Sequence, residues 1–260
     1  MSILLRARDV RASLATWTAL GRLSAASPLG PFLTVDPRGA LRGAPGGEPV
    51  GAIDGCGVDA EASWMPVFGV GDVAHAAARV VRAGGGLVGR TGDYFCVCVD
   101  PWGVEFGFRA SRLGGMGGAQ HPAPGELAWL ERSVGEDAHV AAAAAFYSTA
   151  LGWTGGVVPG GDAEAPPYAV MRAGGRRVAG ITTTSEIECA EPCVPQWLPY
   201  FETGTEAALD LVAARADELR VVRRLCPPTP TADGVFALLT DYENGLRFGL
   251  LCRVPRAADE

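Results

Sequence analysis

The chain repeats part of its own sequence, and this internal repeat limits the folds that it can adopt. The motif Trp-x-Pro-x-Phe occurs at 64–68 and again at 197–201, 133 residues later (197 − 64). Downstream of each copy, Gly103-Val-Glu-Phe-Gly107 is matched by Gly245-Leu-Arg-Phe-Gly249. The matched segments keep the same order, and their spacing changes slightly. A duplicated domain with loops of varying length produces this pattern.

The length of the chain agrees with a duplication. Its 260 residues can form two domains of the usual size, roughly 110–130 residues each. We place the first domain at 1–110 and the second at 126–255. The segment 111–125 between them is rich in Gly and Pro, as expected of a linker.

Hydrophobic periodicity predicts the same order of strands and helices in both halves. The predicted order is β-α-β-β with a probable further strand, followed by β-α-β-β-β. The predicted helices are 9–21, 72–83, 137–151 and 205–218. The segment 36–48, rich in Gly and Pro, reads as a loop by composition. The chain is therefore predicted to be an α+β protein of tandem βαβββ modules, four in all.

Composition excludes several classes of function. The net charge of −7 does not favour nucleic acid or anionic lipid as a partner. All 22 basic residues are Arg, which excludes a lysine Schiff base. Seven cysteines without a CxxC motif indicate a reducing compartment, and no apolar run reaches the roughly 18 residues of a membrane span. We expect a cytoplasmic protein, either a monomer that forms an internal pseudo-dimer or a homodimer.

Three motifs carry a resemblance to a known superfamily. They are Phe146-Tyr-Ser-Thr-Ala-Leu-Gly-Trp153, the Trp-x-Pro-x-Phe strand and Asp100-Pro-Trp-Gly103. With paired βαβββ modules they resemble the vicinal oxygen chelate superfamily of glyoxalase I, bleomycin-resistance proteins and extradiol dioxygenases. Within it, the chain looks most like two-domain actinobacterial members labelled glyoxalase-like. The resemblance implies that each domain curls its strands into a cup that holds a ligand or a metal.

Metal-using members of this superfamily take their ligands from the first, fifth and last strands of a domain. The motif match places these positions near Ser2 and at Met65, Gly107, Trp129, Leu198 and Gly249. None of them offers an imidazole or a carboxylate, which such a metal needs. The only histidines, His75, His121 and His139, are expected at the surface, and no pair has ligand spacing. We therefore expect neither a metal nor a cofactor in either half.

Strand alternation predicts which further side chains face each cup, because every second residue points the same way. It adds Val67, Glu105, Glu131, Tyr200 and Arg247 to the positions above. The predicted lining is mostly apolar with an aromatic wall, as in small-molecule pockets.

The residues of this lining have structural alternatives. Trp129 either fills the space that a metal once held or stacks on a ligand. Glu105 and Arg247 either form a structural ion pair or take part in catalysis. Glu131 is either a general base or an exposed carboxylate at a strand end. Gly107 and Gly249 leave room for a ligand or allow close strand packing, whereas Trp64 and Trp197 point the other way and are expected in the core.

These observations lead to two main hypotheses for the function. The first is a metal-free enzyme that tailors a bulky, partly aromatic secondary metabolite by proton transfer, cyclisation or isomerisation. Its catalytic residues are then Glu131, Glu105 and Tyr200, and its ligand-binding residues are Met65, Val67, Gly107, Trp129, Leu198, Arg247 and Gly249. The alternative is a protein that only binds and sequesters an antibiotic. A third, weaker hypothesis is a metal-dependent lyase or dioxygenase with unrecognised ligands.

Overall fold

The structure is a computed structural model of mixed α+β class. It describes residues 2–7, 34–35, 40–42, 49–55, 62–111, 122–158, 166–183, 194–220, 222–231, 233–242 and 245–253. The predicted helix at 9–21 lies outside these residues, as do His121 and most of the predicted linker. No helix in the described part of the chain is both long and apolar enough to cross a membrane.

The chain divides into two compact units, and each takes segments from both sides of the predicted linker. The first unit comprises 65–118 and 129–197, and the second comprises 2–64, 119–128 and 198–260. The predicted domain boundaries follow the sequence repeat instead of this grouping, and they stay a prediction.

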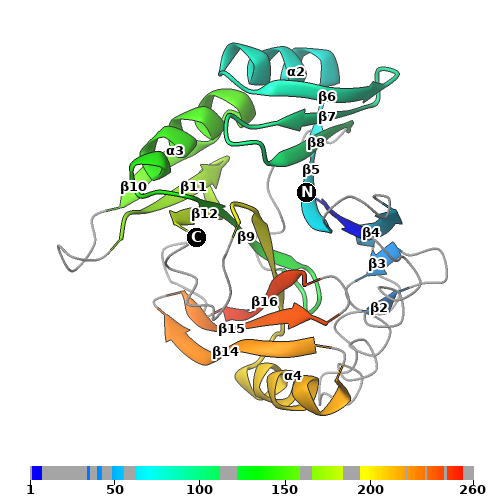
Figure 1. Ribbon diagram of the computed structural model, residues 1–260, viewed down its shortest axis with the longest axis vertical. Helices are drawn as coiled ribbons and strands as arrows, with labels where there is room; N and C mark the ends of the chain where they lie inside the picture. The colour runs from blue at the N-terminus through cyan, green and yellow to red at the C-terminus, as the bar shows by residue number, and fades with distance from the viewer. Residues whose placement is uncertain are drawn as a thin grey trace. The chain divides into compact units, whose positions relative to one another are not determined.

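The first unit contains two groups of strands (Figure 1). One has the order β5-β8-β7-β6 and the other the order β10-β11-β12-β9. The strands of the first group are β5 (Ser63–Val70), β6 (Gly86–Thr91), β7 (Phe95–Val99) and β8 (Glu105–Ala110). Those of the second group are β9 (Leu127–Val134), β10 (Thr154–Val158), β11 (Tyr168–Ala173) and β12 (Arg176–Thr183).

The second unit also contains two groups, in the orders β2-β3-β4-β1 and β13-β16-β15-β14. The first consists of β1 (Ser2–Ala7), β2 (Thr34–Val35), β3 (Ala40–Arg42) and β4 (Pro49–Gly55). The other consists of β13 (Trp197–Glu202), β14 (Val222–Thr231), β15 (Gly234–Asp241) and β16 (Arg247–Arg253). A hydrogen bond of 2.7 Å from Trp64 Nε1 to the carbonyl oxygen of Arg247 lies within this unit.

All four groups share one strand order, in which the first strand lies parallel to the fourth. In all four a residue of the first strand pairs in register with a glycine of the fourth, as Ile3 does with Gly51, and in three of them the pair includes a predicted site residue. These three pairs are Val67 with Gly107, Glu131 with Gly180 and Tyr200 with Gly249. Paired residues point to the same face of a sheet. Each of these first-strand side chains therefore lies beside a glycine, which has no side chain.

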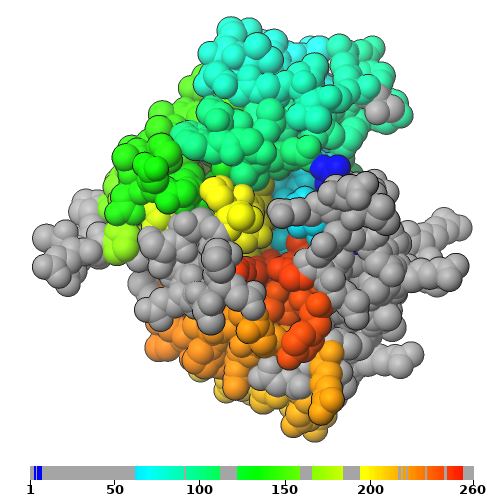
Figure 2. All heavy atoms as spheres, in the orientation of Figure 1, coloured from blue at the N-terminus to red at the C-terminus, as the bar shows by residue number. Residues whose placement is uncertain are grey.

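Described helices pack on three of the strand groups. Helix α2 (Val73–Arg82) buries Val73, Ala77 and Val80 and packs on β6, β7 and β8, and it lies at the surface of the first unit (Figures 1 and 2). The helix begins at Asp72, whose carboxylate accepts a hydrogen bond from the backbone N–H of His75 at 2.9 Å. The amphipathic pattern predicted for this helix is confirmed.

The two other described helices occupy the corresponding places. Helix α3 (Ala138–Leu151) packs on β10, β11 and β12, and α4 (Glu206–Leu219) packs on β14, β15 and β16 (Figure 1).

The core of the first unit is rich in aromatic rings in edge-to-face contact. Phe68 meets Trp153 with ring centroids 5.5 Å apart, and Tyr147 meets Trp197 at 5.2 Å. Such contacts stabilise a core beyond the burial of apolar area. The expectation that Trp64 and Trp197 are core residues is confirmed, since both are buried in their respective units.

Some strands differ from the sequence prediction. The segment 36–48, predicted as a loop, contains β3, and β10 was not predicted at all. Strand β14 runs to Thr231 although it contains Pro227, Pro228 and Pro230. Because β14 lies at the edge of its group, missing N–H donors are tolerated on its unpaired side.

Candidate functional site

The best-defined candidate site lies on one face of β9, β12 and β11 in the first unit, around Gly180. The hydroxyl of Tyr168 donates a hydrogen bond to Glu131 Oε2 at 3.4 Å. A Cβ atom on Gly180 would lie 2.0 Å from that hydroxyl oxygen and 3.3 Å from the Trp129 ring. Tyr168 and Trp129 therefore converge above the backbone of Gly180, and only glycine fits beneath them.

The site also contains a positively charged side chain, Arg177, near the indole of Trp129. The guanidinium carbon of Arg177 lies 5.8 Å from the centroid of the Trp129 ring, within the range of a cation–π interaction. Trp129 is 8% exposed, and Glu131 is half-buried. The face thus combines a buried aromatic surface, a carboxylate and a phenol, which suits a planar ligand with polar substituents.

The sequence predicted only part of this site. It identified Trp129 and Glu131 as facing residues, whereas Tyr168, Arg177 and Gly180 were missed. Alternation identifies facing residues only along the strands that carry the family's ligand positions, whereas Tyr168, Arg177 and Gly180 lie on β11 and β12. The same rule applied from Glu131 to its neighbouring strands would have needed their register, which is not local information.

In the second unit, the predicted residues Tyr200 and Gly249 lie side by side. A Cβ atom on Gly249 would lie 1.9 Å from Cδ1 of Tyr200, so the tyrosine ring occupies the space beside this glycine. The ring also meets Phe236 edge-on, with centroids 6.1 Å apart. Leu198 and Arg247, two residues from Tyr200 and Gly249, are buried. The roles of these four residues in ligand binding or catalysis stay a prediction.

Among the predicted residues of the first half, Val67 and Gly107 lie together. A Cβ atom on Gly107 would lie 3.4 Å from Val67 Cγ2 and 3.4 Å from the Phe95 ring. Met65 is buried and Glu105 is half-buried. Glu105 belongs to the first unit and Arg247 to the second, so their proposed ion pair stays a prediction.

The residues present do not fit the metal that the resemblance implies. The described positions aligned with metal ligands carry Met65, Gly107, Trp129, Leu198 and Gly249, none of which offers a nitrogen or oxygen ligand from its side chain that suits such an ion. The Tyr200 ring fills the space in which a side chain at position 249 would begin. Within the described ranges, no three His, Cys, Asp or Glu side chains gather as metal ligands.

The two described histidines differ in their surroundings. His75 is exposed, as expected. His139 is half-buried instead, and its ring lies 5.8 Å from that of Trp102.

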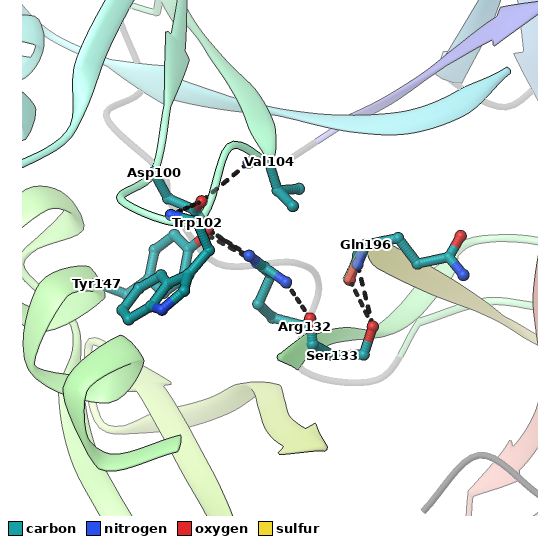
Figure 3. A network of polar contacts seen from close by, with 7 residues as sticks. All are labelled: Asp100, Trp102, Val104, Arg132, Ser133, Tyr147 and Gln196. Carbon is teal, nitrogen blue, oxygen red and sulfur yellow. Dashed lines mark hydrogen bonds and ion pairs between the residues drawn. The ribbon is translucent and has the colours of Figure 1, made fainter. Parts of the chain in front are cut away.

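A buried ion pair supports β9 from the side opposite the candidate site (Figure 3). Arg132 Nη2 and Nε donate to Asp100 Oδ2 at 2.7 and 2.9 Å, and the Tyr147 hydroxyl donates to the same oxygen at 2.7 Å. The other oxygen, Oδ1, accepts the backbone N–H groups of Trp102 and Val104 at 3.0 and 2.9 Å. Asp100 and Arg132 are both 0% exposed. Each charge is therefore paired and hydrogen-bonded, as burial requires.

This network fixes the protonation of its phenol. Burial raises the pKa of Tyr147 well above its ordinary value, so the hydroxyl remains a neutral donor. The sequence contains no local signal for this network. From the sequence alone, Arg132 cannot be distinguished from an exposed charged residue beside Glu131, because its burial depends on tertiary packing.

The second unit holds a further buried carboxylate. Glu202 is 5% exposed and accepts a hydrogen bond from the N–H of Gly204 at 2.9 Å. Burial raises the pKa of Glu202, although backbone donors oppose the effect. Glu202 lies two residues after Tyr200, and strand alternation continued by one step would have found it.

No protein-family model and no curated protein matches the chain. Solved structures match it along nearly its whole length. A Mn(II)-bound glyoxalase from Novosphingobium aromaticivorans has a TM-score of 0.61 at 14% identity, covering 100% of this chain and 84% of the other. The chain has the vicinal oxygen chelate fold.

Two dioxygenases show the same vicinal oxygen chelate fold. A variant of homoprotocatechuate 2,3-dioxygenase from B. fuscum has a TM-score of 0.65 at 13% identity, covering 99% of this chain and 72% of the other. The 2,3-dioxygenase LapB from Pseudomonas sp. KL28 has a TM-score of 0.57 at 13% identity, covering 100% and 93%. At these identities the likeness concerns the fold alone, and function has to be argued from the site.

Proposed function

We propose that the protein binds a bulky, partly aromatic metabolite without a metal and transforms it by moving a proton. One observation carries this proposal: Trp129, Tyr168 and Glu131 converge around Gly180 on one face of β9, β12 and β11. The positions at which the fold's enzymes would hold a metal offer no suitable ligands, so the aromatic face and its carboxylate are the chemistry available.

Each residue of the face has a defined part in this proposal. Trp129 provides an apolar surface on which a planar ring stacks. Glu131 accepts a proton from the ligand and returns it at another atom, which amounts to general acid–base catalysis. Tyr168, whose hydroxyl donates to Glu131 Oε2, orients the carboxylate.

The first test replaces the proton acceptor and keeps its shape. With the molecule that co-purifies with the protein as substrate, we expect Glu131→Gln to lower kcat at least about 100-fold and to leave the affinity within about 2-fold. Glu105→Gln tests the second predicted carboxylate in the same assay. Glu136→Gln, at an exposed position before α3, is the control and should behave as the wild type. Turnover that is unchanged in both Glu131→Gln and Glu105→Gln would refute the catalytic assignment.

Sequestration without turnover is the second candidate, and the contact between Trp129 and Arg177 favours it. Stacking of a ligand on Trp129 requires a complementary shape and an aromatic surface, but it requires no acid or base. In that case the wild type returns its ligand unchanged after prolonged incubation. Trp129→Ala then weakens binding, and Glu131→Gln does not.

A further inference from the structure

Thr182 on β12 carries a buried hydroxyl that makes no hydrogen bond to the described residues. The residue is 2% exposed, and no described residue forms a hydrogen bond with its Oγ1 atom. Burial of a hydroxyl without a partner is unfavourable, and native proteins seldom leave one unpaired. The hydroxyl therefore lacks a hydrogen-bond partner among the described residues, and a ligand can provide one.

Strand register places Thr182 on the face of the candidate site. Thr182 pairs with Ser133 and Gly180 pairs with Glu131 across the parallel strands β12 and β9. Gly180 also pairs with Val170 of β11. Because side chains two residues apart share a face, the side chains of Thr182, Glu131 and Tyr168 all lie on the side of the sheet to which Gly180 belongs.

Other buried hydroxyls of the chain do have partners. Ser133 Oγ accepts the N–H of Gln196 at 3.0 Å and donates to the carbonyl oxygen of the same residue at 3.3 Å (Figure 3). The hydroxyl of Thr203 donates to the carbonyl oxygen of Leu251 at 3.4 Å. Thr182 thus differs from comparable residues, and its neighbour in register is already satisfied.

We propose that the Thr182 hydroxyl binds a carbonyl oxygen of the ligand, so that the ligand is a planar aromatic carbonyl compound. This inference rests on the function proposed above. Glu131 can accept a hydrogen bond from a ligand hydroxyl, but it cannot serve a carbonyl. Tyr168 already donates its hydrogen to Glu131. Thr182 supplies a neutral hydroxyl donor on this face, in addition to the Arg177 guanidinium near Trp129, and a ring stacked on Trp129 would carry the carbonyl group.

A matched pair of probes tests this inference. 2-Acetylnaphthalene and 2-isopropenylnaphthalene have nearly the same shape, and the carbonyl oxygen of the first is a methylene group in the second. Affinities are measured by equilibrium dialysis on the full-length wild type, on Thr182→Val and Thr182→Ser, and on Thr149→Val. Thr149 lies on the exposed side of α3 and serves as the control for loss of a threonine hydroxyl.

We expect the wild type to bind the ketone about 10-fold more tightly than the alkene, the usual gain from one hydrogen bond. Thr182→Val should lose this preference without losing affinity for the alkene. Thr182→Ser and Thr149→Val should keep it. The melting temperature of Thr182→Val should not fall, because the variant removes an unpaired hydroxyl.

The outcomes distinguish this inference from the proposed function. Equal wild-type affinities for the two probes, a measurement that needs no variant, would overturn the role of Thr182 and leave aromatic binding intact. A preference that survives in Thr182→Val would do the same. Failure of both probes to bind, or binding that ignores Trp129→Ala, would overturn the inference together with the proposed function.

Discussion

At the scale of single residues, Asp100 and Arg132 show how strongly this chain depends on one buried ion pair. Arg132→Met should lower the free energy of unfolding by about 3–5 kcal/mol, because it leaves the Asp100 carboxylate buried without its cation. Urea denaturation followed by circular dichroism measures the change.

The chain contains a matched control for this prediction. Arg90 and Asp93 form an ion pair in which the side chains are 42% and 95% exposed, and such pairs contribute at most about 1 kcal/mol. Arg90→Met should therefore have little effect. Equal losses of unfolding free energy in the two variants would show that burial does not make the Asp100–Arg132 pair more stabilising than an exposed pair.

Glu202 predicts a pH dependence of stability. Its pKa in the folded protein is raised above the ordinary value of 4.5, so the unfolded chain releases the proton more readily. The stability that the group contributes is complete below about pH 4.5 and is lost as the pH rises through the raised value.

Glu202→Gln resembles the protonated residue at every pH. Relative to the wild type, it should therefore gain stability between pH 4 and pH 8, as measured by urea denaturation at intervals of pH. A difference between variant and wild type that stays constant over this range would contradict the assignment.

The sequence predicted residues of the candidate site where a local rule was sufficient. Alternation along one strand identified Trp129 and Glu131. It did not identify Tyr168, Arg177 or Thr182, because their approach to Glu131 depends on strand register across β9, β12 and β11. Local periodicity carries no information about which strands become neighbours.

At the scale of elements, the glycines of the fourth strands differ in how closely they are covered. In β16, a Cβ atom on Gly249 would lie 1.9 Å from the Tyr200 ring, whereas in β8 a Cβ atom on Gly107 has no neighbour closer than 3.3 Å. Gly249→Ala should therefore lower the free energy of unfolding by about 1–3 kcal/mol, the usual cost of overpacking.

Two further variants check this explanation. Gly107→Ala should lower the free energy of unfolding less than Gly249→Ala does, because the added methyl group at position 107 makes only close van der Waals contacts. The double variant Tyr200→Ala, Gly249→Ala should show favourable coupling in a double-mutant cycle, since the clash is gone. Additive effects, or equal losses for the two glycines, would contradict the account.

The elements that the sequence predicted best have strong periodicity and end signals. Helix α2 was placed within a residue or two because Asp72 begins it and an apolar stripe runs along it. Strand β10 was missed, since Thr154-Gly-Gly-Val-Val158 is short and rich in glycine. The length of strand β14 is not evident from the sequence, because its prolines favour a loop unless the strand lies at an edge.

At the scale of the whole molecule, the sequence repeat and the compact units group the chain differently. The repeat divides it near residues 111–125, whereas each compact unit combines strands from both sides of that segment. The Asp100–Arg132 pair joins the two halves within the first unit, and the Trp64–Arg247 hydrogen bond joins them within the second.

This grouping predicts how fragments of the chain behave. Neither 1–118 nor 119–260 should fold alone, because each contains only part of either unit. When mixed, the two fragments should recover the circular dichroism spectrum and the cooperative melting of the intact chain. Cooperative melting of either fragment by itself would show that the predicted domains fold independently.

The most direct test of the central claim is native mass spectrometry of the protein as purified, combined with analysis of its metal content. The proposed function predicts less than one-tenth of an equivalent of metal and a bound organic molecule with an aromatic chromophore, which Trp129→Ala should lose. One equivalent of Mn, Fe, Ni or Zn that resists dialysis would contradict it. That result would restore the metal-dependent lyase or dioxygenase hypothesis, with ligands other than the residues aligned here.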